Sequence, residues 1–347
     1  MDRSSITVLV TGATGFIGKH TVLAALDAGY KVRGTVRRLA SGENVRAVVH
    51  AHAKSPDTID DQLSFVEADL TRDDGWAAAV DGCAYVLHVA SPFPLREPKN
   101  REDVIAPARD GALRVLKAAA ASDVVRTVLT SSVVAVMYPT PEPGQQLYNE
   151  SHWTAPQRDD VTAYVASKAI AERAAWDFID GGQGALQLNT VNPGLVLGPA
   201  LDDDMSSSVE LITMMAKGQM PAVPRVAYPV VDVRDVAAMH LVAMEHPQAT
   251  GERFICSAGM MPLMQIGRII ARELPDLRWK TPKVTAPDWL VRAGSLIDPS
   301  AKAVLADLGR GKRLDNAKSK RVLGFTYRSN DAAVSDCVRS LRALKLV

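Results

Sequence analysis

Tyr164 and Lys168 stand four residues apart within residues 162–179, whose apolar spacing predicts a helix. Because positions four apart share a helix face, a phenol and an ammonium can meet there around one ligand. A free tyrosine has a pKa of about 10, and a neighbouring ammonium would favour the phenolate and lower that pKa. Ser132 follows the predicted strand 127–131 and can hydrogen-bond a carbonyl oxygen that gains negative charge. These residue types suit hydride attack on a carbonyl carbon with proton transfer to its oxygen.

Each of these residues also has an ordinary structural interpretation when it is taken alone. Lys168 could be a solvated helix lysine, and Ser132 a strand-end hydroxyl bonded to backbone. A Tyr-x-x-x-Lys spacing arises by chance in many chains. The catalytic interpretation therefore depends on further motifs at the same crevice, which are residues 130–132, residues 191–194 and a glycine-rich turn.

The glycine-rich turn, residues 11–18, reads TGATGFIG and lies between a predicted strand and a predicted helix. Gly12 permits a tight turn, Gly15 lets backbone approach a pyrophosphate, and Gly18 lets helix and strand pack closely. Free N–H groups at the helix N-terminus favour bound phosphate. A purely structural turn is the alternative, but the strand-to-helix junction is the context that a dinucleotide site requires. The cofactor-binding residues expected here are Gly12, Thr14, Gly15, Phe16, Ile17 and Gly18.

The end of the second predicted strand carries arginines and no acid, since residues 31–38 read KVRGTVRR. An NAD-selective site normally has an acidic residue there that accepts the ribose hydroxyls. Arg37 or Arg38 could instead pair with a 2′-phosphate, and two solvated loop arginines are the alternative. The pattern favours NADP, supplied as NADPH, over NAD. Asp69 and Leu70 follow the third predicted strand and are expected near adenine, unless Asp69 serves only as a helix N-cap.

Up to about residue 200, short apolar strands alternate with amphipathic helical patterns. The predicted strands are residues 6–10, 31–36, 63–67, 85–90, 127–131 and 187–191, and the predicted helices are 17–28, 76–80, 104–121 and 162–179. This alternation predicts an α/β fold, a Rossmann-type doubly wound parallel sheet with ligands beyond the strand C-termini. We expect residues 1–200 to form an NADP-binding domain that carries the Ser-Tyr-Lys set.

Beyond residue 200 the alternation ends, and residues 201–347 are expected to form mainly a smaller C-terminal substrate-binding lobe, with some segments returning to the Rossmann core. A strand followed by a helix is predicted over residues 230–246, and helices over 263–274, 319–323 and 332–344. Three prolines within residues 220–229 disfavour regular structure there.

Six motifs occur in the order TGATGFIG, VLHVASP, VLTSS, YVASK, NPGLVLGP and VDVRDVAAMHLVAMEHP. They resemble the extended short-chain dehydrogenase/reductase family, and more narrowly its dihydroflavonol reductase, cinnamoyl-CoA reductase and microbial NADPH carbonyl reductase branch. The resemblance covers nearly the whole chain and implies that Ser132, Tyr164 and Lys168 are catalytic and that Arg37 binds the 2′-phosphate. The remaining cofactor-binding residues expected are Asp69, Leu70, Val89, Ala90, Ser91, Thr130, Pro193, Val196 and Ser208. Many relatives carry a relay asparagine where residues 109–112 here read RDGA, so we assign none.

The bulk composition is that of an ordinary globular protein, with a net charge of +1. No long-range field therefore favours nucleic acid or an acidic membrane surface. The cysteines Cys83, Cys256 and Cys337 form no CxxC pair, which argues against a disulfide scaffold or a zinc site. We expect a cytoplasmic protein without a bound metal or a membrane span, present as a monomer or homodimer.

The expected activity is NADPH-dependent reduction of an aldehyde or ketone to an alcohol, with the proton supplied by Tyr164. The alternatives are a sugar-nucleotide epimerase or dehydratase, disfavoured by the missing acid, and an NADP-sensing protein, disfavoured by the intact catalytic set. The substrate pocket is expected to be apolar and to bind small or medium-sized substrates by burial. Its predicted residues are Phe93, Met137, Tyr138, Val223, Pro224 and Tyr228. Met137 and Tyr138 could equally be packing residues, and Arg225 could meet a carboxylate or phosphate instead.

Overall fold

The central sheet has seven parallel strands in the order β11-β7-β5-β4-β1-β2-β3. The computed structural model describes residues 2–92, 100–142, 144–182, 184–296 and 304–347. The strands are β1 (Thr7–Thr11), β2 (Lys31–Val36), β3 (Leu63–Glu67), β4 (Tyr85–His88), β5 (Arg126–Thr130), β7 (Gln187–Pro193) and β11 (Arg253–Cys256). Strand order reverses between β1 and β4, where a doubly wound sheet opens its ligand crevice. The predicted Rossmann-type fold is therefore confirmed.

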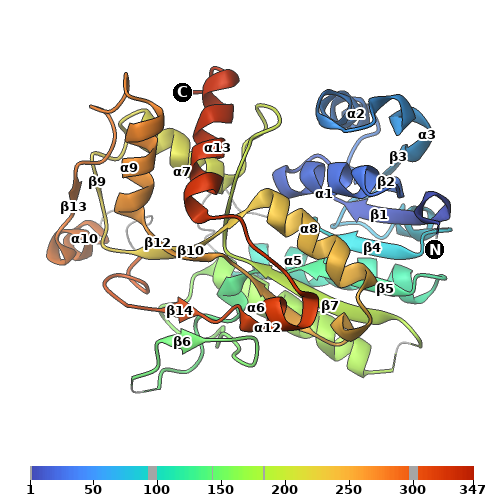
Figure 1. Ribbon diagram of the computed structural model, residues 1–347. Coiled ribbons are helices and arrows are strands. Elements are labelled where there is room, and N and C mark those ends of the chain that lie inside the picture. The colour runs from blue at the N-terminus through green and yellow to red at the C-terminus, as the bar shows by residue number, and fades with distance from the viewer. Residues whose placement is uncertain (1, 93–99, 143, 183, 297–303) are drawn as a thin grey trace.

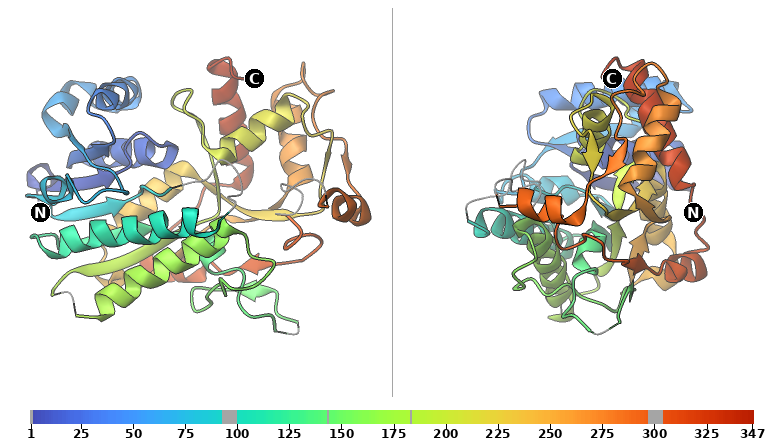
Figure 2. Two further views of the ribbon diagram at one scale, coloured as in Figure 1. Left: turned by 180° about the vertical axis from the view of Figure 1, so that it is seen from behind. Right: turned by 90° about the vertical axis from the view of Figure 1, so that its left-hand side faces the viewer.

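Helices cover both faces of this sheet (Figure 1). On one face lie α1 (Phe16–Asp27), α2 (Ala40–His52) and α8 (Val233–Glu245), and on the other α4 (Trp76–Val80), α5 (Glu102–Ala120) and α6 (Ala163–Asp180). Figure 2 shows α5 and α6 side by side along the second face. The short α3 (Ile59–Gln62) precedes β3. The sheet is thus buried from both sides, as parallel sheets are.

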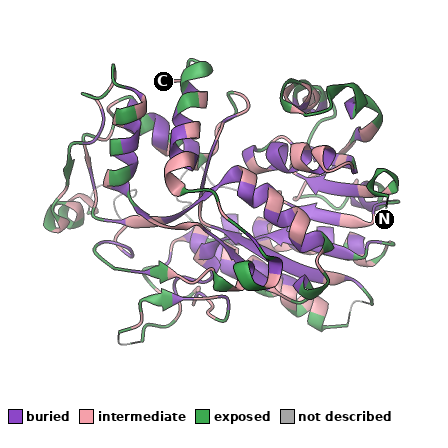
Figure 3. Ribbon diagram, in the orientation of Figure 1, coloured by how far each residue is buried: buried purple, intermediate pink, exposed green. Residues whose placement is uncertain are grey.

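The C-terminal lobe is built on a three-stranded sheet of β8 (Leu195–Leu197), β10 (Ala227–Asp232) and β12 (Gly259–Pro262). Packed on it are α7 (Ser207–Ala216), α9 (Leu263–Glu273) and α13 (Asn330–Ala343). The peripheral elements are β9 (Ala222–Val223), β13 (Val284–Thr285), α10 (Asp288–Gly294), β6 (Leu147–Tyr148), β14 (Arg313–Leu314) and α12 (Ala317–Leu323). One hydrophobic cluster runs from Val8 in β1 to Leu341 in α13, so lobe and sheet share a core (Figure 3).

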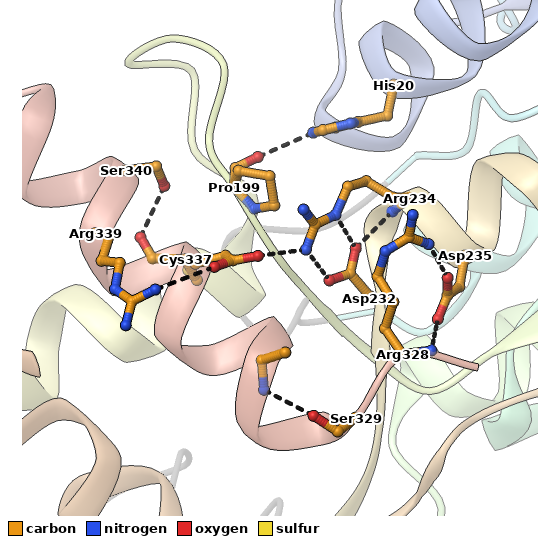
Figure 4. Close-up of polar contacts among 12 residues, drawn as sticks. His20, Pro199, Asp232, Arg234, Asp235, Arg328, Ser329, Cys337, Arg339 and Ser340 are labelled. Carbon is orange, nitrogen blue, oxygen red and sulfur yellow. Dashed lines mark hydrogen bonds and ion pairs between the residues drawn. The ribbon is translucent and has the colours of Figure 1, made fainter.

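Ion pairs fasten α13 to the segment that connects lobe and sheet (Figure 4). Arg234 bridges Asp232 and Asp336, with 2.6 Å to each carboxylate. Arg328 pairs with the buried Asp235 at the start of α8. A buried carboxylate is stable only when it is paired in this way. These contacts join α13 and the segment before it to the junction of β10 and α8.

Two segments beyond residue 200 belong structurally to the Rossmann sheet. The helix α8 packs on α1, and β11 adds a strand beside β7. The expectation of irregular structure over residues 220–229 was wrong in part, because β9 and the start of β10 lie there. Pro229 is accommodated because β10 begins to pair with β8 only at Val230, so at Pro229 the strand has β12 as its one neighbour and an edge on the other side.

Candidate active site

A cavity of about 770 Å³ lies at the C-terminal ends of β1, β2, β3, β4, β5 and β7. It contains every residue expected to be catalytic and every expected cofactor residue except Arg38. These lining residues are Gly12, Thr14, Gly15, Phe16, Ile17, Gly18, Arg37, Asp69, Leu70, Val89, Ala90, Ser91, Thr130, Ser132, Tyr164, Lys168, Pro193, Val196 and Ser208. Parallel strands bring these distant segments together because their carboxyl ends share one edge.

The glycine-rich turn lines the cavity at the N-terminus of α1. Gly12 has a φ of +67°, and a Cβ there would come within 2.9 Å of Ala90 Cα. A Cβ on Gly18 would meet the carbonyl oxygen of Gly12 at 2.0 Å. Both positions therefore need glycine for the fold itself.

Gly15 is different, because the fold does not require its missing side chain. Its φ is −76°, and the nearest atom to a Cβ would be the Gly12 carbonyl oxygen at 3.6 Å. As the N-cap of α1, Gly15 has no side chain to occupy the helix N-terminus. The turn therefore leaves space and N–H groups at the positive end of a helix dipole, which suits a phosphate.

Arg37 lines the cavity immediately after β2, and it is exposed. Across from it, hydrogen bonds from Thr71 backbone and side chain to Asp69 hold the pKa of that carboxyl below its usual range, with a smaller contribution from Arg37. Arg38 is exposed and outside the lining, so the structure separates the two arginines.

The three expected catalytic side chains meet at the end of β5. Thr162 caps α6 by accepting a hydrogen bond from Val165 N (3.3 Å), which starts the helix just before Tyr164. The Ser132 hydroxyl hydrogen-bonds the Tyr164 phenol and donates weakly to the Pro193 carbonyl (3.4 Å). Lys168 Nζ lies 5.7 Å from the centre of the Tyr164 ring and donates to Ser91 Oγ at 2.8 Å.

Burial governs the ionisation of this set. Loss of hydration raises the pKa of Tyr164 to about 12, and the Ser132 hydrogen bond opposes it. Burial also lowers the pKa of Lys168 to about 8, opposed by the Glu172 carboxylate. The expected lowering of the Tyr164 pKa by Lys168 stays a prediction. The hydrogen bond that opposes burial at the phenol comes from Ser132, and the Lys168 ammonium is directed at Ser91.

Other polar residues at this edge are engaged with the fold. His88 Nδ1 and the Thr11 hydroxyl lie 2.8 Å apart, and Thr11 Oγ1 accepts from Ala90 N. Burial lowers the pKa of His88 to about 3, so its ring is neutral. Thr130 lines the cavity, but its hydroxyl pairs with His240 Nε2 at 2.6 Å. His88 is a packed histidine, as expected.

The segment that leads into α7 was missed by the sequence analysis apart from Ser208. The unpredicted lining residues are Thr35, Val36, Ala68, Thr71, Trp76, Pro92, Ser131, Gly194, Asp204, Met205, Ser206, Ser207 and Glu210. Lys19 on α1 holds this segment through Asp202 at 2.5 Å and Asp204 at 3.4 Å. Ser206 caps α7 by accepting a hydrogen bond from Val209 N at 3.4 Å. A serine directly before an apolar helical pattern is a helix-start signal that could have located the segment.

The predicted substrate-pocket residues that the structure describes do not line this cavity. Met137, Tyr138 and Val223 are buried in the protein, and the Tyr138 hydroxyl donates to Asp307 at 2.7 Å. Pro224 and Tyr228 are half-buried outside the lining, and Phe93 lies outside the described residues. Arg225 forms an ion pair with Asp288 at 2.5 Å, so its charge already has a partner within the protein.

Comparison with known proteins places this geometry in a family. Residues 8–257 match the NAD dependent epimerase/dehydratase family. The chain belongs to that family. Within it, the chain is 31% identical to the NADPH-dependent methylglyoxal reductase GRE2 of Saccharomyces cerevisiae, over 95% of this chain and 96% of the relative. It is 33% identical to the ketoreductase azaE of Aspergillus niger, over 96% and 97%. Cinnamoyl-CoA reductase 1 of Arabidopsis thaliana is also 33% identical, over 97% and 89%.

Solved structures of the family agree with this placement. The yeast methylglyoxal/isovaleraldehyde reductase Gre2 complexed with NADPH superposes with a TM-score of 0.80 at 28% identity, covering 99% of this chain and 100% of that chain. Gre2 of Candida albicans in complex with NADPH gives 0.79 at 29% identity, covering 98% and 99%. The resemblance predicted from motifs is therefore confirmed.

The described residues contain no cluster of three or more His, Cys, Asp or Glu side chains that could hold a metal ion. None of the helices in the described ranges is both long and apolar enough to cross a membrane.

Proposed function

We propose that this chain is an NADPH-dependent carbonyl reductase that converts an aldehyde or ketone to an alcohol. The observation that carries the proposal is one cavity in which a dinucleotide-type glycine turn, an arginine at the end of β2 and the Ser132–Tyr164–Lys168 set converge. Full-length likeness to reductases, two of them solved with NADPH, supports the same activity.

The residues present fit NADPH. Gly15 and the N-terminus of α1 would hold the diphosphate, because space and N–H groups are available there. Arg37 would pair with the 2′-phosphate, and Asp69 and Leu70 would border adenine. Lys168 would hold the nicotinamide ribose, between Val89–Ser91 and Pro193.

NADPH, when bound, supplies the hydride that attacks the carbonyl carbon. Tyr164 donates its phenolic proton to the carbonyl oxygen, and its raised pKa keeps that proton in place at neutral pH. Ser132 orients the same oxygen by a hydrogen bond and is already bonded to the phenol. The Lys168 ammonium holds the cofactor and lies near the ring of Tyr164.

Arg37 also favours a reductase over an epimerase or dehydratase, which recycles tightly bound NAD and needs an acid to hold its ribose. In this chain β2 is followed by Arg37 and not by an acid. We expect its substrate to be an apolar aldehyde or ketone.

The direct test is an NADPH-oxidation screen over aliphatic and aromatic aldehydes, ketones, diketones, flavonols, acyl-CoA esters and nucleotide sugars, with the alcohol identified by mass spectrometry. We expect uncharged aldehydes and ketones to be turned over. Binding of NADPH without turnover of any carbonyl compound would instead indicate a sensor. Isomerisation of a nucleotide sugar without net NADPH consumption would indicate an epimerase.

We further propose a cytoplasmic monomer or homodimer. The three cysteines are buried and unpaired, which fits a reducing compartment. Gel filtration at low micromolar concentration distinguishes the two assemblies.

A further inference from the structure

Glu172 lies on α6 one helical turn beyond Lys168, with only 1% of its surface exposed. Its carboxylate accepts hydrogen bonds from Ser131 Oγ (2.5 Å), Thr190 Oγ1 (3.1 Å), Asn192 Nδ2 (2.8 Å) and Arg253 Nε (2.6 Å). These four donors follow or belong to β5, β7 and β11. One carboxylate therefore ties the catalytic helix to three strands of the sheet.

The Glu172 carboxylate is linked to the backbone of Ser132 through the side chain of Asn192. Asn192 Nδ2, which donates to Glu172, also donates to the Ser132 carbonyl at 3.2 Å. The adjacent Ser131 is fixed twice, by its hydroxyl to Glu172 and by its N–H to the Val191 carbonyl at 2.8 Å. The position of Ser132 relative to α6 thus depends on Glu172.

Arg253 supplies the counter-charge, and its surroundings show that the charge is required. Its Nη1 donates to the backbone carbonyls of Glu150 (2.6 Å) and His152 (2.8 Å). Its guanidinium stacks on the Trp153 ring at 3.6 Å. A buried arginine at the first position of β11 is stable only when its partner remains ionised.

Lys168 and Glu172 both line a second cavity of about 20 Å³, which has room for about one water molecule. Lys168 and Glu172 are the two charged residues among its described lining. His88, from β4, is neutral, and α5 contributes only Ala108 and Ala112. On α6 itself, Lys168 is flanked by the protonated Tyr164 on its other side.

We propose that Glu172 is a positioning residue of the reductase site, whose buried carboxylate keeps Lys168 protonated across this cavity and holds Ser132 against α6. Burial destabilises the Lys168 ammonium, and Glu172 is the charge that opposes this effect. The inference rests on the proposed function, in which the ammonium holds the cofactor. Removing the negative charge should therefore neutralise Lys168 at a lower pH.

The experiment compares Glu172→Gln with Glu172→Asp, which keeps the charge, and with Glu150→Gln. Glu150 is a second buried glutamate, which accepts from Ile255 N at 3.0 Å and does not line either cavity near Lys168. The double variant Glu172→Gln/Arg253→Gln removes both charges of the buried pair. It therefore leaves no unpaired buried charge that could prevent folding. For each, kcat/KM for NADPH is measured against pH, and the reactivity of the Lys168 amine toward acetic anhydride is followed by mass spectrometry.

In Glu172→Gln and in the double variant, we expect kcat/KM for NADPH to fall at a pH about one unit lower than in the wild type. This shift corresponds to a roughly eightfold lower kcat/KM at pH 8.5 and little change at pH 6. Acetylation of Lys168 should begin at correspondingly lower pH. Glu172→Asp and Glu150→Gln should keep the wild-type profile even if they unfold at lower temperature. A uniform loss of activity with an unchanged pH profile and unchanged acetylation would overturn the inference and leave Glu172 a structural residue. Absence of NADPH turnover in the wild type would refute the proposed function instead, while the acetylation comparison would still test the role of Glu172.

Discussion

Arg37→Ala removes the one arginine of the 37–38 pair that lines the cavity. If Arg37 binds the 2′-phosphate, the variant loses a charge-assisted hydrogen bond to NADPH, worth about 1.5 to 3 kcal/mol. The exposure of Arg37 places the effect near the lower end, which corresponds to a roughly tenfold to thirtyfold fall in kcat/KM for NADPH. NADH lacks the phosphate, so its kcat/KM should change by less than about twofold.

Arg38→Ala is the matched control, because Arg38 has the same charge and exposure at the next position but does not line the cavity. It should leave the ratio of NADPH to NADH efficiency close to wild type. Steady-state kinetics with both cofactors, at one ionic strength, gives this ratio for the three proteins. If Arg37→Ala lowers kcat/KM equally for NADPH and NADH, Arg37 does not bind the 2′-phosphate. The same conclusion follows if Arg38→Ala lowers the ratio of NADPH to NADH efficiency as much as Arg37→Ala does.

Three further predictions concern the catalytic set and the turn. Tyr164→Phe should lower kcat by about 10³-fold or more while the Kd for NADPH stays within about threefold, since the phenol donates the proton but is one cofactor contact of many; substantial turnover would place the acid elsewhere. Because the pKa of Lys168 is about 8 and the charged form holds the cofactor, kcat/KM for NADPH should fall as pH rises through about 8, and a flat profile to pH 9.5 would contradict this role. Gly15→Ala should weaken NADPH binding and cost less than about 1 kcal/mol of stability, since alanine is a poorer N-cap than glycine. Gly18→Ala should cost about 1 to 3 kcal/mol of stability through its clash with Gly12. Calorimetry and titration separate the two effects, and an equal fall in Tm for both variants would refute the distinction.

Local patterns determine the elements that local physics controls. The predicted strands 31–36 and 63–67 and the predicted helix 76–80 match the bounds of β2, β3 and α4, because the residue pattern within each short segment is enough to predict it. The strand β11 is harder to predict because it has four residues and begins with a charged one, Arg253. Its burial becomes understandable only when Glu172, far away in the sequence, is placed beside it.

The candidate site follows the same division. The predicted cofactor residues lie directly after strands. Parallel strands place such positions at one edge of the sheet, and this placement does not depend on the conformation of the intervening loops. Substrate residues such as Tyr138 and Tyr228 depend on how the lobe packs. Tyr138 is drawn to Asp307 and Lys312, a buried ion pair on a segment more than a hundred residues away. A local sequence pattern cannot predict a contact with residues so far away in the sequence.

The protonation of Tyr164 shows why environment as well as residue type decides the chemistry. A lysine four residues away suggests a phenolate, yet the folded protein partly buries both groups, and loss of hydration raises the pKa of Tyr164 to about 12. A donor must hold its proton until the carbonyl oxygen gains charge, whereas the reverse oxidation must begin from the phenolate. Partial burial of Tyr164 therefore favours the protonated phenol from which carbonyl reduction starts, and the Glu172 carboxylate favours the charged form of Lys168 that we propose holds the cofactor.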